Sequence, residues 1–385
     1  MTAVPITLES RPVGAPPGTA AADLLSTDLD ALRARVDAAT PRDVERALLA
    51  TRRSLDDFAA LLSPPATERL EDIADLAHQT TVRRFGRTIH LFAPLYLSSE
   101  CVSTCTYCGF SAGNDITRRT LSPDEVLSEA RALTARGFRH LLLVAGEHAR
   151  VVSKDYLVDC VRVLAPEVPS ISLEVQVWDT DTYGRLVGAG CEGLVVYQET
   201  YDRATYAGAH LKGKKRNYDW RLSALDRGAE AGMRRLGLGA LLGLHHDWRG
   251  EALAVAAHAQ ALLRRWWRCE VSLSLPRIRP AAGGFQPPGP VDDRHFVQLL
   301  CALRLLLPDV ALVLSTREEP DFRDAVLRLG ITHLSAGSHT EPGGYASASD
   351  AEPQFQTSDN RSPGEVAELV RAAGYDPVWK DWERS

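Results

Sequence analysis

Long hydrophobic runs, an excess of positive charge and a secretory leader are all missing from this sequence. Although 45% of its 385 residues are hydrophobic, no run approaches the roughly 20 apolar residues that span a membrane. Acidic residues number 50 against 44 basic ones, whereas nucleic-acid-binding proteins usually carry a basic patch. Residues 1–24 lack a charged segment followed by an apolar core, and their Pro, Gly, Ala and Thr predict a mobile tail. We therefore expect neither a membrane nor a nucleic-acid partner.

A disulfide framework is also missing. The chain has seven cysteines, an odd number, and their spacing matches no disulfide-rich domain. Four of them are scattered in apolar or helical surroundings: Cys160, Cys191, Cys269 and Cys301. Free buried cysteines are ordinary in a reducing compartment, so the sequence predicts a cytoplasmic protein.

The other three cysteines lie within eight residues and form the most informative motif. Cys101, Cys105 and Cys108 have the spacing C-x3-C-x2-C. A [4Fe–4S] cluster has four irons, and each iron takes a ligand such as a thiolate. Three clustered cysteines leave one iron open for a ligand that is not protein. A structural zinc site is the alternative, but zinc takes four ligands, usually in two pairs, and the sequence has no second pair.

The hydrophobic pattern divides the chain into three segments. Residues 1–85 combine the tail with helix signals, residues 86–340 alternate strands with helices, and residues 341–385 form an irregular cap followed by one helix. Strand–helix alternation predicts a parallel α/β sheet. Eight units over about 250 residues favour a TIM-type (β/α)8 barrel over an open doubly wound sheet. The predicted strands are 88–93, 140–144, 172–177, 193–197, 235–242, 270–275, 310–314 and 331–335.

Polar residues follow nearly every predicted strand. In a parallel barrel the reactive groups lie on the loops after the strands, so these side chains should meet at one rim. Each also has a structural interpretation: Glu147 as a helix cap, Glu174 and Glu199 in ion pairs, and Arg317 in a surface pair with Glu318. The run Lys212-Gly213-Lys214-Lys215-Arg216 is either a solvated loop or a site for ligand capture or partner docking.

Longer motifs resemble a known family. The cysteine motif, with Tyr107 before its last cysteine, resembles the radical S-adenosylmethionine (SAM) superfamily. From about residue 43 onward, the chain resembles the ThiH-type 2-iminoacetate synthases, or tyrosine lyases, of thiamine thiazole biosynthesis. The motifs are LYLS at 95–98, CGFS at 108–111, YQETY at 197–201, HLKGKK at 210–215, LSTRE at 314–318, PGGY at 342–345 and WKDW at 379–382.

The resemblance implies a radical-SAM barrel with two cofactors, a [4Fe–4S] cluster and SAM. It implies cleavage of the Cα–Cβ bond of L-tyrosine to 2-iminoacetate (dehydroglycine) and p-cresol, with 5′-deoxyadenosine and methionine as co-products. The expected partners are a low-potential electron donor of the flavodoxin or ferredoxin type and, as is usual in the family, thiazole synthase.

The resemblance also implies residue roles at the two cofactors. Cys101, Cys105 and Cys108 hold the cluster. Glu147 accepts hydrogen bonds from the SAM ammonium group, and Tyr107 faces adenine. The expected cofactor-binding residues are Tyr107, Gly146, Glu147, Glu174, Tyr197 and Glu199, of which Glu174 and Glu199 suit the ribose hydroxyls.

Three residues are expected at the amino-acid substrate. Arg317 is the natural bidentate partner of the tyrosine carboxylate, and Tyr96 and Ser335 are placed to fix its amine. A related tryptophan lyase shares these three positions, so tryptophan is the alternative substrate.

Two other activities are weighed against this one. The related hydrogenase-maturation lyase carries a second cluster on a C-terminal cysteine motif, and this sequence has no cysteine after Cys301. An electron carrier without chemistry of its own would normally close its cluster with a fourth cysteine.

Overall fold

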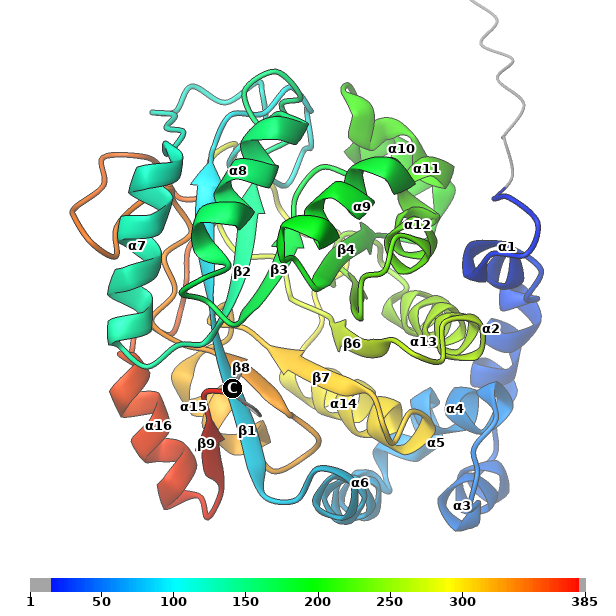
Figure 1. The fold of residues 1–385 in the computed structure, drawn as a ribbon. Helices are drawn as coiled ribbons and strands as arrows, with labels where there is room; N and C mark the ends of the chain where they lie inside the picture. Colours follow the sequence, from blue (N-terminus) through cyan, green and yellow to red (C-terminus); the bar gives the residue numbers. More distant parts are fainter. Residues whose placement is uncertain (1–14, 381–385) are drawn as a thin grey trace, which may run out of the picture.

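The computed structural model describes residues 15–380, and its centre is a closed barrel of eight parallel strands (Figure 1). Neighbouring strands follow one another along the chain from β2 to β8, and β1 pairs with both β8 and β2, which closes the barrel. The strands are β1(Thr88–Ser98), β2(His140–Ala145), β3(Ser170–Glu174), β4(Gly193–Glu199), β5(Arg235–Ala240), β6(Glu270–Ser274), β7(Ala311–Leu314) and β8(His333–Ser335).

The predicted (β/α)8 barrel is confirmed, and each predicted strand overlaps an observed one. The open doubly wound sheet is wrong, because the first and second strands complete the ring. The largest difference is in β1, which was predicted to end at Ala93, just before Pro94. Proline lacks the N–H that a strand donates, but Pro94 pairs in register with Leu142, and the flanking residues are buried. The strand therefore reaches Ser98 and carries Tyr96 to the barrel mouth.

Helices surround the barrel and return the chain from the end of one strand to the start of the next. α7 shows how the sequence sets their starts: Ser122 and Glu125 form a capping box around Pro123 at the first helical position. The outer helices are α7(Pro123–Ala135), α8(Lys154–Leu164), α9(Thr180–Ala189), α10(Arg203–Ala209), α11(Tyr218–Leu222), α12(Ala224–Glu230), α13(Trp248–Arg265), α14(Asp293–Leu306) and α15(Pro320–Val326), with the short 3-10 turn η1(Lys214–Arg216) between α10 and α11.

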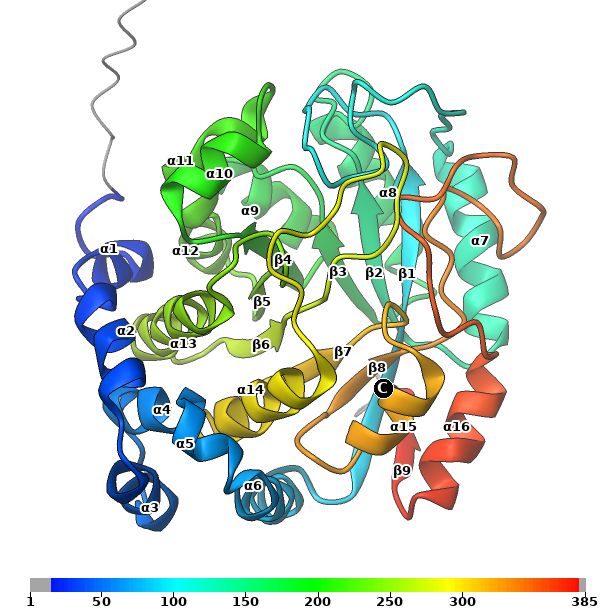
Figure 2. The ribbon, with the colours of Figure 1, turned by 180° about the vertical axis from the view of Figure 1, so that it is seen from behind.

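Six N-terminal helices lie beside the barrel, and several of them pack directly against α13 or α14 (Figure 2). They are α1(Ala20–Leu25), α2(Leu29–Ala38), α3(Pro41–Leu49), α4(Leu55–Leu62), α5(Pro64–Thr67) and α6(Leu70–Phe85). The start of α1 is fixed by Asp226, whose carboxylate accepts from the backbone N–H groups of Ala20 (2.8 Å) and Ala21 (3.1 Å). The expected mobile tail is therefore wrong for residues 20–24, while residues 1–14 lie outside the described part of the chain.

The C-terminal segment crosses the barrel mouth before it returns to the bottom. Between β8 and α16(Pro363–Ala372) it has no regular structure, and its backbone bonds to barrel loops. The N–H of Gln356 donates to the carbonyl of Pro280 (3.0 Å), and that of Ser358 to the carbonyl of Thr316 (2.9 Å). β9(Asp376–Val378) then pairs with the start of β1. In the WKDW motif, Trp379 packs on Phe138 with ring centroids 5.2 Å apart, and Trp382 lies outside the described residues.

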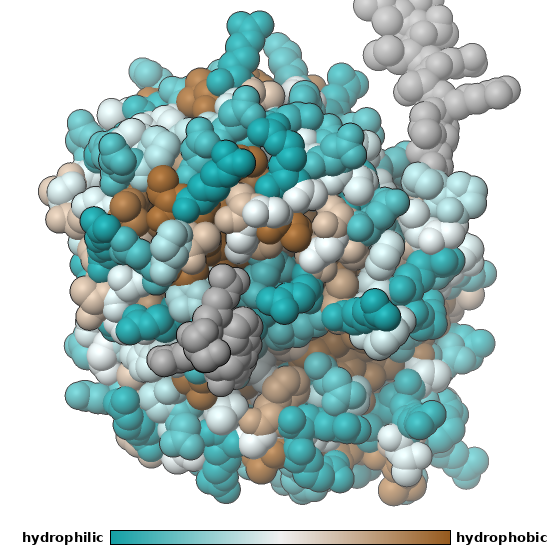
Figure 3. Space-filling model, viewed as in Figure 1, coloured by the Kyte–Doolittle hydropathy of each residue, from teal (hydrophilic) through white to brown (hydrophobic). Residues whose placement is uncertain are grey.

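The exposed surface in the view of Figure 1 is a mosaic of hydrophilic and smaller hydrophobic areas (Figure 3). Among residues 15–380, no helix combines the length and apolar character that crossing a membrane requires.

Candidate active site

One pocket at the carboxyl end of the barrel is lined by every site residue that the sequence predicted. Strands and loops far apart in the chain contribute to it, as expected for the rim of a parallel barrel. The predicted residues that line it are Tyr96, Cys101, Cys105, Tyr107, Cys108, Gly146, Glu147, Glu174, Tyr197, Glu199, Arg317 and Ser335. The structure thus brings these side chains together, and their individual roles stay predictions.

The loop after β1 holds the three cysteines at one side of this pocket. It is fixed from outside by residues 209–212: the N–H of Thr104 donates to the carbonyl of Lys212 (3.2 Å), and the N–H of Leu211 donates to that of Thr104 (3.1 Å). It is fixed from inside by Gly146 at the end of β2, where a Cβ atom would lie 2.4 Å from the carbonyl oxygen of Glu100. Only glycine permits this close approach.

The donor set of this loop fits a [4Fe–4S] cluster. All three cysteines are free and line the same pocket. Each thiolate can bind a different iron of such a cluster. The three cysteines therefore supply ligands for three irons of one cluster.

A buried network of two acids and two bases forms the wall beside the cysteines. Arg221 Nη1 lies 3.2 Å from Glu147 Oε1, and Arg221 Nη2 lies 3.7 Å from Glu199 Oε1. Lys215 Nζ donates to Glu199 Oε1 at 2.7 Å. The Ser103 hydroxyl, from the cysteine loop, donates to Glu147 Oε2 at 3.2 Å. The interpretation of Glu147 as a helix cap is wrong, since its carboxylate faces the pocket.

The backbone of Glu199 has a strained conformation. Its φ is +70°, and no other non-glycine residue among residues 15–380 has a positive φ. Such backbone strain concentrates at functional sites. Burial alone would raise the pKa of the Glu199 carboxyl, but the charges of Lys215 and Arg221 outweigh burial and hold it below its ordinary value. Glu199 is therefore ionised at neutral pH.

The pKa of Glu174 is shifted in the opposite direction. Burial, reinforced by the charge of Glu199, raises the pKa of Glu174 to about 7, against the opposing effect of Arg317. The pocket thus holds Glu199, which is ionised at neutral pH, and Glu174, which changes charge near neutral pH. This second group can donate a hydrogen bond when protonated and accept one when ionised.

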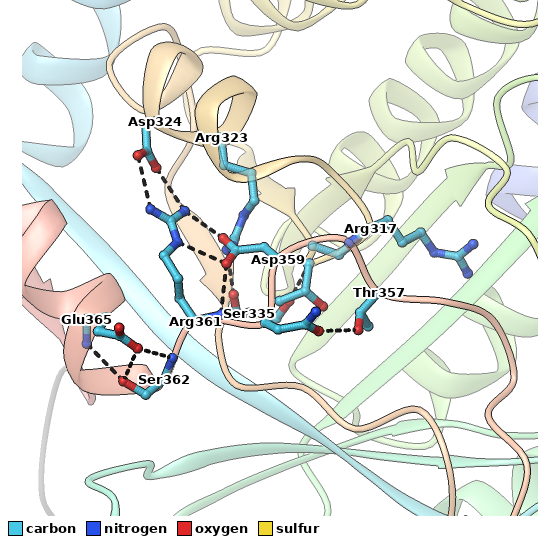
Figure 4. Close-up of polar contacts among 12 residues, drawn as sticks. Arg317, Arg323, Asp324, Ser335, Thr357, Asp359, Arg361, Ser362 and Glu365 are labelled. Carbon is cyan, nitrogen blue, oxygen red and sulfur yellow. Dashed lines mark hydrogen bonds and ion pairs between the residues drawn. The ribbon is translucent and has the colours of Figure 1, made fainter.

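Arg317 also lines the pocket, and its guanidinium is available to bind an anion. Its guanidinium carbon lies 3.4 Å from the centroid of the Phe355 ring, and it forms no ion pair with a carboxylate of residues 15–380. The expected alternative, a surface pair with Glu318, is wrong because Glu318 pairs with Arg277 and Arg279. Figure 4 shows the Arg317 side chain reaching away from the ion pairs around Asp359.

Ser335 and Tyr96 line the same pocket, and Tyr96 packs close to Cys101 and Cys108. The Ser335 hydroxyl accepts from the N–H of Thr316 at 3.1 Å, next to Arg317. The Tyr96 hydroxyl donates to Gln354 Oε1 at 2.8 Å. The other end of the same amide, Gln354 Nε2, lies 3.6 Å from Cys108 Sγ and donates to it.

The pocket residues that the sequence analysis missed include Arg221, Gln354 and Phe355. No local sequence signal distinguishes Arg221 from Arg216, the exposed last residue of the basic run five positions earlier. Gln354 and Phe355 stand in a segment without periodicity, and only the tertiary fold places that segment over the barrel mouth. Lys215 belonged to a run whose role was left open.

Comparison with known proteins agrees with this site. Residues 95–255 match the radical SAM superfamily, and residues 274–376 match the biotin and thiamin synthesis associated domain. The chain is 46% identical to the 2-iminoacetate synthase of Escherichia coli over 356 residues, which cover 92% of this chain and 94% of that protein. The Salmonella typhimurium 2-iminoacetate synthase is also 46% identical, over 354 residues that cover 92% and 94% of the two chains.

The crystal structure of HydG, a maturase of the [FeFe]-hydrogenase, superposes with a TM-score of 0.87 at 32% identity and covers 93% of this chain and 81% of its own. Sequence and structure together show that this chain belongs to the 2-iminoacetate synthase family of radical SAM lyases.

Proposed function

We propose that this pocket cleaves the Cα–Cβ bond of L-tyrosine to give 2-iminoacetate and p-cresol, with SAM converted to 5′-deoxyadenosine and methionine. The observation that carries the proposal is the pairing, in one pocket, of three cluster-type cysteines with an arginine that has no carboxylate partner among residues 15–380. The family relationship supports the same reaction.

The residues around the cysteines suit the two cofactors. Cys101, Cys105 and Cys108 would hold the cluster, and Glu147 offers carboxylate oxygens to the SAM ammonium group. When bound, the cluster and SAM supply a 5′-deoxyadenosyl radical. Glu199 is kept ionised by Lys215 and Arg221, so it serves as a hydrogen-bond acceptor for ribose hydroxyls. The surrounding protein orients the reacting groups and excludes side reactions.

Other residues of the same pocket suit an amino acid. Arg317 presents a planar fork that matches a carboxylate bidentately. Stacking on Phe355 holds that fork in place. Tyr96 and Ser335 place hydroxyl oxygens where they can fix the amine of the substrate.

The proposal includes partners and a location. A low-potential donor of the flavodoxin or ferredoxin type supplies the electron, and thiazole synthase receives the reactive 2-iminoacetate. A cytoplasmic location is supported by seven cysteines that are all free thiols.

The substitution Arg317→Lys tests the substrate assignment. Lysine keeps the charge but loses the planar fork, and a charge-assisted hydrogen bond contributes about 1.5–3 kcal/mol. We expect the KM for tyrosine to rise about tenfold or more, while equilibrium dialysis shows SAM binding to the reconstituted protein unchanged. The matched control is Arg371→Lys, on the exposed face of α16, which should alter neither value. Unchanged tyrosine kinetics in Arg317→Lys would remove Arg317 from the substrate site.

A further inference from the structure

A basic and partly apolar surface covers the outside of the cysteine loop. It consists of Val102, Leu211, Lys212, Lys214 and Arg216, and we call it the basic loop surface. Its two aliphatic side chains are unusually exposed, Val102 at 46% and Leu211 at 52%. The three cations are exposed as well. Large exposed aliphatic groups rimmed by charge are typical of interaction sites.

The cations of this surface have no acidic partners within the described chain. None of Lys212, Lys214 and Arg216 forms an ion pair with a carboxylate of residues 15–380. Lys214 lies 5.7 Å from the centroid of the Trp178 ring. The middle cation, Lys215, behaves differently, because it turns inward onto Glu199. The run thus divides into one pocket residue and three outward charges.

Nearby carboxylates do not neutralise these charges. Asp202 accepts from the N–H of Thr205 as the cap of α10, and Asp219 pairs with Arg203. The whole chain carries a net charge of −6. An unneutralised basic patch on an acidic protein favours a partner of negative charge, since complementary charges steer association.

The position of the surface points to the type of partner. Backbone hydrogen bonds join residues 209–212 directly to the cysteine loop, at Thr104 and at Thr106. Val102 stands between Cys101 and Ser103, and both of these line the pocket. The loop after β1 and the α10–α11 region both lie at the carboxyl end of the barrel, at the top of Figure 1. A protein docked here would place its own redox centre close to the cluster, and electron transfer weakens steeply with distance.

We propose that the basic loop surface is the docking site of an acidic, low-potential electron-donor protein. This proposal rests on the proposed function, because it concerns delivery of the electron that the reaction needs. The step is a one-electron transfer: the reduced donor loses one electron, and the cluster gains it and changes from the 2+ to the 1+ state. No bond is formed or broken at this step.

The test separates docking from chemistry. We would prepare the reconstituted enzyme with Lys212→Glu and Lys214→Glu together, and use an acidic flavodoxin in its hydroquinone form as the probe. At low ionic strength, the association rate constant with flavodoxin should fall about tenfold or more, and added salt should change it much less than in wild type. SAM cleavage driven by dithionite should stay at the wild-type rate, since these two side chains do not line the pocket.

Two further double variants test whether the lost association comes from the charges of the basic loop surface. The milder Lys212→Gln and Lys214→Gln pair should give a smaller decrease in the association rate, in case charge reversal disturbs the loop. The matched control, Arg52→Glu with Arg371→Glu, changes the same total charge on exposed arginines outside this surface, and should leave most of the association rate intact.

Three results would overturn the proposal. The first is a wild-type association rate of flavodoxin with both the Lys→Glu and the Lys→Gln pair. The second is an equal loss of association rate in the arginine control. The third is a lysine variant that associates normally with flavodoxin but no longer binds thiazole synthase. Failure of the proposed function looks different, because wild-type enzyme with dithionite, SAM and tyrosine would then release no p-cresol, whatever flavodoxin does.

Discussion

Gln354 shows how a single amide can join the substrate side of the pocket to the cluster side. It accepts from the Tyr96 hydroxyl and donates to Cys108 Sγ. A Cβ atom on Gly109 would lie 2.4 Å from the carbonyl oxygen of Gln354, so the cysteine loop and the C-terminal segment are in close contact here. Hydrogen bonds to cluster sulfurs are one of the factors that set the reduction potential.

We therefore expect Gln354→Leu to make the reduction potential of the reconstituted cluster more negative. Loss of the N–H donor removes stabilisation of the added negative charge. The measurement is a redox titration followed by electron paramagnetic resonance. Gln356→Leu, two residues along the same segment and exposed, should leave the potential unchanged. An unchanged potential in Gln354→Leu would mean that this hydrogen bond does not act on the cluster.

The cysteines divide into two groups with different expected phenotypes. Replacing Cys101, Cys105 or Cys108 with Ala should abolish both the [4Fe–4S] absorbance after reconstitution and all SAM cleavage. Single replacement of Cys160, Cys191, Cys269 or Cys301, which line neither the pocket nor the cysteine loop, should leave both largely intact. If one of these four were equally indispensable for the absorbance, the cluster would not have an open iron.

At the scale of elements, the C-terminal segment matters because it roofs the pocket. It is anchored by Asp359, which pairs with Arg323 and with Arg361 (2.6 Å), while Arg361 also pairs with Asp324 at 2.9 Å (Figure 4). Arg323 and Asp359 are both buried, and Arg323 also donates to the carbonyl of Ser335. The anchor is thus continuous with a pocket residue.

Asp359→Asn should lower the free energy of unfolding by about 3 kcal/mol, because it leaves Arg323 buried without its counter-charge. Burial opposes ionisation of Asp359, but Arg361 and Arg323 together hold the pKa of its carboxyl below the ordinary value. The stabilisation is therefore complete above the unfolded pKa of about 3.9 and is lost as the pH falls through the lower folded pKa.

Denaturant unfolding at several pH values checks this prediction. The difference between wild type and Asp359→Asn should be largest near neutral pH and should shrink below about pH 4. Asp350→Asn is the matched control, since Asp350 is exposed in the same segment, and its unfolding should match wild type throughout. An Asp359→Asn protein as stable as wild type would remove this anchor from the account.

The elements themselves were largely predictable from sequence. Apolar runs located all eight strands, and capping boxes such as Ser122 with Glu125 fixed helix starts. Strand ends were less predictable. Pro94 lies inside β1 because it pairs with Leu142 and its neighbours are buried. A local sequence pattern contains neither of these tertiary contacts. Likewise the docking of α1 depends on Asp226, a residue about two hundred positions away along the chain.

At the scale of the whole molecule, the barrel rim explains which site residues could be predicted. Residues that follow strands must meet at the carboxyl end of the barrel. The sequence alone therefore predicted Glu147, Glu199 and Arg317 at this rim. Gln354 and Phe355 reach the pocket from a segment whose path depends on tertiary contacts. Arg221 comes from a short helix beside the barrel, and its inward orientation is set by two buried carboxylates.

The division of the chain into segments 1–85, 86–340 and 341–385 stays a prediction. The extension packs on α13 and α14, and the C-terminal segment supplies both pocket residues and β9, so all three segments contribute to one structure. Such sharing fits an enzyme whose radical chemistry has to be enclosed on every side.

The measurement that tests the central claim most directly is product analysis under anaerobic conditions with SAM, dithionite and either L-tyrosine or L-tryptophan. The account predicts p-cresol and 2-iminoacetate, detected as glyoxylate after hydrolysis, in equal amounts with 5′-deoxyadenosine, and little turnover of tryptophan. Preferential turnover of tryptophan, or SAM cleavage without p-cresol, would contradict it.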